Sequence, residues 1–147
     1  MIDAKVIVKA FCERLGIEAE ADTEGVYSFS VDDVEFAIHD LSEEELVLLT
    51  GDLSPVPPND VEGLFRLMLE AQHNFQGTAG AIFSIDSERD CFVLSRVIPY
   101  VALDEDMLFS EVERFVNHLE AWTHIIRNYE GCEEPDESLP DSYSIKV

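Results

Sequence analysis

The segment VEGLFRLMLEAQHNF, residues 61–75, places the strongest constraint on the fold. The spacing predicts a helix, and apolar side chains lie on almost every side of it: Val61, Leu64, Phe65, Leu67, Met68, Leu69 and Ala71. A helix that is apolar nearly all round needs two surfaces to bury it. A β-sheet of the same chain can supply one. The other is most simply a second copy of the chain, which predicts a homodimer.

Strand patterns lie on both sides of this helix. Residues 27–31 and 34–38 alternate apolar and polar side chains, which predicts two half-buried strands joined by a short acidic turn. Residues 46–49 are apolar on both faces, as in a central strand. After the helix, residues 81–85 and 91–98 predict a hairpin around a polar turn.

Two further helices complete the pattern. Residues 4–15 have helical spacing, and Gly16 is a stop signal. Asn59 or Asp60 can cap the helix that runs to about Phe75. Asp104 caps a last helix whose apolar stripe consists of Leu108, Val112, Phe115, Leu119, Trp122 and Ile126, with Gly131 as its stop.

The order helix-strand-strand-strand-helix-strand-strand-helix predicts an α+β fold, with a twisted, mainly antiparallel sheet packed with helices. One domain is expected over residues 1–131. Residues 132–147 are rich in Asp and Glu around two prolines, so a flexible acidic tail is expected there.

Composition narrows the possible partners. The 147 residues carry 32 Asp and Glu against nine Lys and Arg, a formal net charge of −23, while 46% of them are apolar. This predicts a soluble globular protein that repels nucleic acid and anionic lipid. No apolar run approaches the roughly 18 residues of a membrane span. The N-terminus resembles no export signal, and three widely spaced cysteines suit a reducing cytoplasm.

No motif in the sequence indicates catalysis, a cofactor or a metal. The four histidines lie at no metal-ligand spacing, and no serine or cysteine sits in a nucleophile motif. Residues 77–80 (GTAG) precede a strand and lack the Lys of a phosphate-binding loop. Residues 86–90 (DSERD) mimic part of a calcium loop, but the glycine that such a loop needs is missing, and a hairpin turn is the preferred interpretation.

Four features in order carry a resemblance to a known family. Residues 67–75 are similar to a Leu-Leu-x-Ala-Asn helix end, with Gln72 where Asn is expected. Residues 77–86 contain a glycine pair that leads into a strand, and residues 93–99 (VLSRVIP) resemble a Leu-x-x-Arg-x-Pro strand. Residues 104–122 form the long final helix with its tryptophan. Together they resemble the class I type III secretion chaperones, the Tir-chaperone (CesT-like) family.

The resemblance implies a small cytoplasmic homodimer without enzymatic activity. Such a chaperone binds the N-terminal segment of one or more secreted effectors, keeps it soluble and extended, and aids its delivery to the secretion apparatus. Family dimers form through the second helix and the strand of the following hairpin. Here this points to Leu64, Phe65, Met68, Leu69, Val93 and Val97.

Effector binding in the family uses apolar patches on the first helix and nearby strands, together with strand pairing at a sheet edge. The candidates in this chain are Val6, Ala10, Tyr27, Phe29, Phe36 and Ile38. For the four strand residues, packing in the core is the alternative interpretation. Val6 and Ala10 are the stronger candidates because they fall outside the core stripe of their helix.

Two other classes remain open at this stage. The charge also suits an acidic regulatory protein that sequesters a basic protein or imitates nucleic acid, which predicts a salt-sensitive complex. A small enzyme or metal-binding domain is the third, and the sequence gives no positive reason for it.

Overall fold

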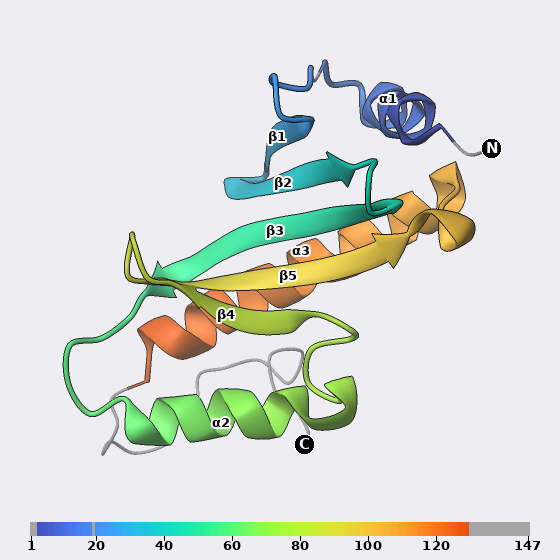
Figure 1. Ribbon diagram of the computed structural model, residues 1–147. Helices are drawn as coiled ribbons and strands as arrows, with labels where there is room; N and C mark the ends of the chain where they lie inside the picture. The colour runs from blue at the N-terminus through green and yellow to red at the C-terminus, as the bar shows by residue number, and fades with distance from the viewer. Residues whose placement is uncertain (1–2, 19, 130–147) are drawn as a thin grey trace. The chain divides into compact units, whose positions relative to one another are not determined.

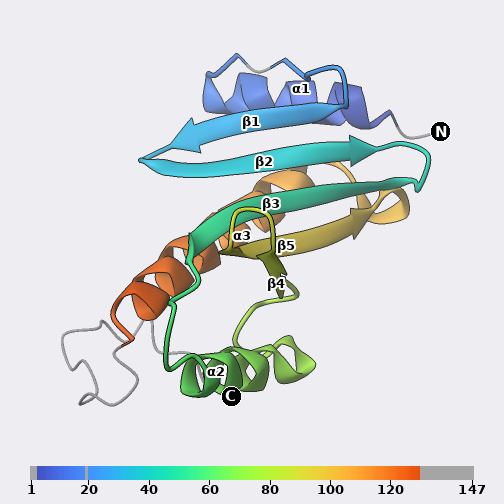
Figure 2. The same cartoon turned by 60° about the vertical axis from the view of Figure 1, so that its left-hand side comes forward.

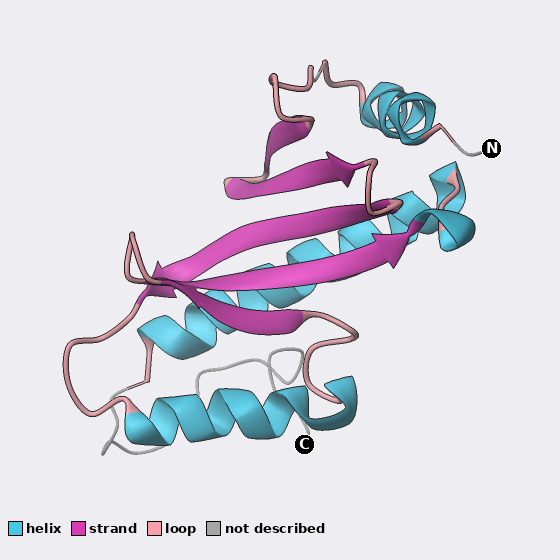
Figure 3. Ribbon diagram, viewed as in Figure 1, coloured by secondary structure: helices cyan, strands magenta, loops and turns pink. Residues whose placement is uncertain are grey.

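The protein is described by a computed structural model that covers residues 3–18 and 20–129. Within these residues the helices and strands are α1 (Ala4–Leu15), β1 (Val26–Val31), β2 (Val34–Leu41), β3 (Leu46–Pro55), α2 (Glu62–Gln72), β4 (Ile82–Asp86), β5 (Cys91–Pro99) and α3 (Glu105–Arg127) (Figure 1). The strands form an antiparallel sheet in the order β1-β2-β3-β5-β4, which places β1 and β4 at its edges. This confirms the predicted α+β fold and the predicted element order, which Figure 3 shows by secondary structure.

The β1–β2 hairpin forms where the alternating pattern predicts it. Val31 pairs with Val34, so Asp32 and Asp33 alone make the turn. Both have positive φ, 51° and 66°. A two-residue turn of this kind matches the twist of its strands and favours Asp, Asn and Gly. The predicted acidic turn is confirmed.

The chain divides into two compact units, which we describe separately. Unit 1 comprises Met1–Gly51 and Ser95–Val116. In it α1 lies over β1 (Figure 2), and the Phe11 ring meets Phe29 edge-on at 5.9 Å between centroids. Phe11 also contacts Phe109 near the start of α3, at 6.3 Å. The predicted cap is confirmed, because Asp104 Oδ1 accepts a hydrogen bond from Met107 N at 2.8 Å.

Unit 2 comprises Asp52–Leu94 and Asn117–Val147. Trp122 is fully buried in it; its indole Nε1 donates to the carbonyl of Gly77 at 3.0 Å, and its ring meets Phe83 of β4 edge-on at 4.9 Å. A methyl group at Gly63 of α2 would overlap the hydroxyl of Tyr129, so glycine permits the close approach at the first turn of α2. The predicted α3 stripe has three residues in unit 1 and three in unit 2, and all six are buried.

The bounds of α2 differ from those predicted. Its N-cap is Val61, with no side-chain hydrogen bond, so the predicted cap at Asn59 or Asp60 is wrong. Asp60 has a φ of 57°, a left-handed conformation outside the helix. The helix ends at Gln72, and a short 3-10 turn follows over residues 73–75. Asn74 and Phe75 have positive φ, which a continuing α-helix does not allow. The loop geometry therefore overrides the apolar pattern at both ends of the helix.

Strand β3 is longer than its apolar core. It continues to Pro55, although the serine and prolines of residues 54–59 predict a break in regular structure there. Its position between β2 and β5 confirms the predicted central strand. Because β3 has a neighbouring strand on each side, its backbone N–H and C=O groups can form hydrogen bonds beyond the apolar residues 46–49. Gly131 and the tail at 132–147 lie outside the described residues.

Candidate functional site

Exposed large apolar side chains mark the candidate binding surfaces. Within the described residues those in unit 1 are Val6, Val97 and Val101, and those in unit 2 are Leu69, Phe75, Ile82 and Ile85. Two helices each combine such a residue with a well-packed opposite side. These are α1 in unit 1 and α2 in unit 2, and they form two separate candidate surfaces.

The surface of α1 is both apolar and positively charged. The helix buries Ala4, Val8, Phe11 and Cys12. On the other side Val6 is 62% exposed and Ala10 is half-buried. Lys5 and Lys9 are exposed beside them. We call Lys5, Val6, Lys9 and Ala10 the α1 stripe.

An open backbone edge lies on β1 in the same unit. The turn pairs Val31 with Val34, so alternate residues Val31, Phe29 and Tyr27 direct their backbone groups toward β2. The residues between them direct theirs to the open side. Val26 shows this directly, because its N–H donates to Asp22 Oδ1 and its carbonyl accepts from Asp22 N, both at 3.0 Å.

The same parity leaves two residues available on this edge. Ser28 and Ser30 are exposed and direct their N–H and C=O groups outward. Among residues 3–18 and 20–129 no hydrogen bond to these groups on the open side is found. The edge can therefore accept a short extended segment by main-chain pairing.

The four strand residues proposed for effector binding lie in the core instead. Tyr27, Phe29, Phe36 and Ile38 are all buried. The rings of Phe29 and Phe36 stack at 5.0 Å between centroids, beneath Phe11 of α1. The burial of these four side chains agrees with the alternative interpretation, that they pack in the core. A single apolar face on a strand predicts burial, but does not show whether a helix of the same chain covers that face.

The surface of α2 has a buried side and an exposed side. Leu64 and Met68, predicted for a dimer interface, are buried within the chain itself. Phe65 is half-buried, with its ring edge-on to Phe92 at 5.8 Å, whereas Leu69 is 66% exposed. Val93 is half-buried in unit 2, and Val97, exposed, belongs to unit 1.

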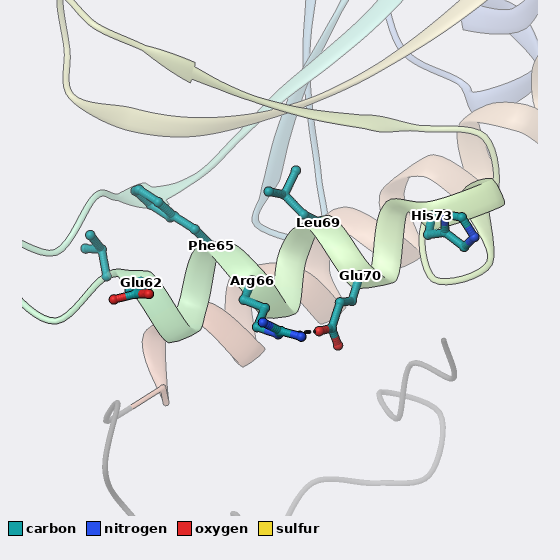
Figure 4. A pocket seen from close by; sticks show the side chains of 7 residues that line it. Glu62, Phe65, Arg66, Leu69, Glu70 and His73 are labelled. Atoms are coloured by element: carbon teal, nitrogen blue, oxygen red, sulfur yellow. Dashed lines mark hydrogen bonds and ion pairs between the residues drawn. The ribbon is translucent and has the colours of Figure 1, made fainter.

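An open groove of about 660 Å³ runs along the exposed side of α2. Its lining residues are Val61, Glu62, Phe65, Arg66, Leu69, Glu70 and His73. Figure 4 shows Phe65 and Leu69 on one side of the helix and the ion pair between Arg66 and Glu70 on another. Arg66 Nε lies 2.6 Å from Glu70 Oε1, so this cation is neutralised by its own helix. We call these seven residues the α2 groove.

The remaining charged clusters hold the fold together. Arg89 in the β4–β5 turn contacts both carboxylate oxygens of Asp52 at 2.5 and 3.0 Å and Asp86 at 2.7 Å. The hydrogen bond from Arg89 is the main cause that lowers the pKa of Asp86. An arginine thus occupies the turn that mimics a calcium loop, which confirms a hairpin turn there. Glu111, buried, accepts from Arg96 at 3.1 Å and Arg114 at 3.3 Å.

The described residues contain no group of three or more His, Cys, Asp or Glu that could hold a metal ion. Cys12 and Cys91 are buried free thiols, and burial raises the pKa of both. Burial is the largest cause that raises the pKa of Tyr100, and its hydrogen bond to Asp40 is the second.

Across residues 3–18 and 20–129, no helix is both long and apolar enough to pass through a bilayer.

The sequence-based reasoning missed several exposed apolar residues. Phe75 and Val101 lie in the two 3-10 turns, and Ile82 and Ile85 lie on the edge strand β4. Apolar character alone does not show whether such a residue is buried or exposed. Lys5 and Lys9 were not among the predicted site residues either, although they are two of only nine positive residues.

Comparison with known proteins gives a consistent result. The model of the Tir chaperone protein (CesT) family matches residues 6–123. A search of curated proteins finds no match. Among solved structures, a chain of the HopA1–SchA chaperone–effector complex is 19% identical, with a TM-score of 0.70 over 84% of this chain and 99% of that one.

Two further solved structures support the same fold. A chain of the ExsC–ExsE complex is 24% identical, with a TM-score of 0.70 over 83% of this chain and 93% of that one. A chain of the ExoU–SpcU complex from the type III secretion system of Pseudomonas aeruginosa is 18% identical, with a TM-score of 0.65 over 84% and 98%. At these identities the likeness establishes the fold.

Proposed function

We propose that this chain, which belongs to the Tir chaperone protein (CesT) family, binds the N-terminal segment of a type III effector, keeps it soluble and extended, and aids its delivery to the secretion apparatus. As a member of this family the chain is a secretion chaperone and not an enzyme. The observation that carries the proposal is the family match across residues 6–123.

The proposed effector site is the α1 stripe together with the open edge of β1. Strand addition at Ser28 and Ser30 supplies main-chain hydrogen bonds, while Val6 and Ala10 supply an apolar contact. The buried Phe11 and Phe29 hold α1 against β1, so the stripe and the edge belong to one packed unit. An extended segment can therefore use both without any folding of its own.

The proposed homodimer uses the α2 groove. Leu69 is the most exposed of its apolar residues, and the half-buried Phe65 lies one turn away. Leu64 and Met68 contribute by packing beneath this surface. Burial of the exposed apolar side of α2 against a second copy would remove it from water, as the nearly all-round apolar pattern of the helix requires.

The charge of −23 suits this function. A protein that offers apolar surface to an unfolded partner risks self-association, and a large net charge opposes that. The cytoplasm is the proposed compartment. Because it is reducing, Cys12 and Cys91 would stay free thiols there, as they are in the structure.

Co-expression with candidate effector segments tests the proposal. The chain should co-purify with the N-terminal segment of a secreted protein, and light scattering should show two copies of the chain in the complex. A complex held by apolar contacts should largely survive about 1 M salt, where the Debye length falls to about 3 Å. A complex that dissociates under those conditions would instead support an acidic regulatory protein, and capture of no effector at all would contradict the proposal.

A further inference from the structure

Positive charge is scarce in this chain and is unequally neutralised. Nine basic residues stand against 32 acidic ones. Arg14, Arg66, Arg89 and Arg96 each lie within 3.1 Å of a carboxylate oxygen. In the part of the chain that the structure describes, neither lysine of the α1 stripe forms an ion pair. The stripe therefore carries two uncompensated positive charges on an otherwise strongly negative protein.

The positions of these lysines are unfavourable for the helix itself. Lys5 lies in the first turn of α1, which contains no acidic residue, and the N-terminal end of a helix disfavours cations. Lys9 lies one turn further on, so two like charges adjoin at a spacing that destabilises helices. Residues that oppose the local stability of an element are typical of functional sites.

The geometry joins this charge to an apolar contact. Val6 and Ala10 are one turn apart on the side of α1 next to the two lysines, and the opposite side is buried. Asp3 and Glu13 bound the stripe at its two ends, so the positive charge is confined to about two turns. The stripe thus offers an apolar strip with ammonium groups along one border.

We infer that the α1 stripe selects effector segments in which carboxylates flank an apolar side chain; this deepens the proposed function and rests on it. The apolar side chain packs on Val6 and Ala10, and the carboxylates pair with Lys5 and Lys9. A chain of net charge −23 repels a carboxylate-bearing segment elsewhere on its surface. The lysines therefore determine where such a segment docks and in which register.

The test measures the binding of labelled peptides that tile the effector segment captured in co-expression. The double variant Lys5→Gln with Lys9→Gln removes the charge, and Lys5→Arg with Lys9→Arg keeps it. Arg127→Gln removes an exposed cation at the end of α3 and serves as the matched control. The glutamine variant should weaken binding of the tightest peptide about tenfold at low salt, as expected for two exposed ion pairs, and the controls should change it less than about twofold.

Salt and peptide sequence provide two further readouts. The difference between the unaltered chain and the glutamine variant should disappear at high salt, where exposed charges are screened. Val6→Ser should also weaken binding, since it removes the apolar contact. The tightest peptide should contain carboxylates beside its apolar anchor. The variant Lys5→Glu with Lys9→Glu should bind this peptide weakly, and replacement of the peptide's carboxylates by lysine should restore binding.

The outcomes separate this inference from the function on which it rests. If the unaltered chain binds no effector peptide, the proposed function is contradicted. If peptides bind but are insensitive to the lysines, or the tightest ones lack carboxylates, only the inference is overturned. A further variant tests whether the chain's own tail occupies the α1 stripe. In it the tail carboxylates are changed to amides in the full-length chain, at Glu133, Glu134, Asp136, Glu137 and Asp141. If peptide binding to this variant is no longer weakened by the glutamine substitutions at Lys5 and Lys9, the inference is overturned.

Discussion

The α1 stripe and the α2 groove look alike in sequence and differ in charge. Each lies on an amphipathic helix whose opposite side is buried, and each exposes a large aliphatic residue, Val6 in one and Leu69 in the other. In the groove, the cation Arg66 pairs with Glu70 of the same helix at 2.6 Å. In the stripe, Lys5 and Lys9 have no such partner among the described residues.

This difference indicates different partners. A two-fold interface brings each surface against its own copy, so an uncompensated charge near the centre would face itself. The α2 groove, with its internally neutralised arginine, is compatible with such an arrangement. The α1 stripe would place lysines near lysines and is better suited to a partner of opposite sign. The proposal therefore assigns a second copy to the α2 groove and the effector to the α1 stripe.

The largest expected effects come from the buried sides of the two helices. Leu64 of α2 is 0% exposed and Phe11 of α1 is 1% exposed, so truncation of either leaves a cavity. Leu64→Ala and Phe11→Ala should each lower the free energy of unfolding by about 2–5 kcal/mol. Urea denaturation at a fixed protein concentration measures this, with Leu64→Met and Phe11→Leu as milder controls. A Leu64→Ala protein of unchanged stability that no longer dimerises would show that Leu64 acts at the interface and not in the core.

Charge on the exposed sides should separate the two surfaces. Leu69→Asp should weaken the dimer by about 2 kcal/mol or more, because it buries an unpaired carboxylate in the proposed interface. Val6→Asp should leave the dimer intact and weaken effector binding. Analytical ultracentrifugation and peptide binding measure the two effects. Dissociation of the dimer by Val6→Asp would contradict the assignment of separate partners.

Acidification should destabilise unit 1, which carries the α1 stripe, by a smaller amount. Burial lowers the pKa of His39 below its ordinary value of 6.5, and Asp22 partly opposes this. The ring Nε2 lies 2.8 Å from Thr50 Oγ1. Between the two pKa values the unfolded chain binds more protons than the folded one, so this contribution to stability is complete above about pH 6.5 and is lost as the pH falls toward the folded value.

The control for this pH dependence is His39→Gln, which removes the titrating group and can keep a hydrogen bond to Thr50. Many carboxylates titrate over the same range, so the informative quantity is the difference in unfolding free energy between the two proteins as a function of pH. That difference should shrink on acidification from pH 7. A difference that stays constant across this range would contradict the assignment.

Much of the fold follows from short-range patterns. The Asp32–Asp33 turn, the Asp104 cap and the apolar stripe of α3 each depend on neighbours within a few residues, and all three are found as predicted. The caps and bounds of α2 were not predictable in this way. Asp60, Asn74 and Phe75 take left-handed conformations that depend on the surrounding loops, which no local pattern encodes.

The candidate site was less predictable than the fold. When a helix is apolar on nearly every side, its sequence cannot tell which side faces the sheet, so Leu64 and Leu69 look equivalent although one is buried and the other exposed. Phe29 and Phe36 could be core or surface until the position of Phe11 is known. That Lys5 and Lys9 have no carboxylate partner among residues 3–18 and 20–129 can be read only from the three-dimensional structure.

The smallest expected effect distinguishes the two helices by its sign. Lys5→Gln removes a cation from the first turn of α1 and should raise the free energy of unfolding by about 0.3–1 kcal/mol. Arg66→Gln breaks the exposed pair with Glu70 and should lower it by about 0.3–0.5 kcal/mol. Thermal unfolding at low salt measures both, and high salt should reduce both. If Lys5→Gln is destabilising, the lysine has a structural role in the fold, and its unfavourable position no longer argues for a role in effector recognition.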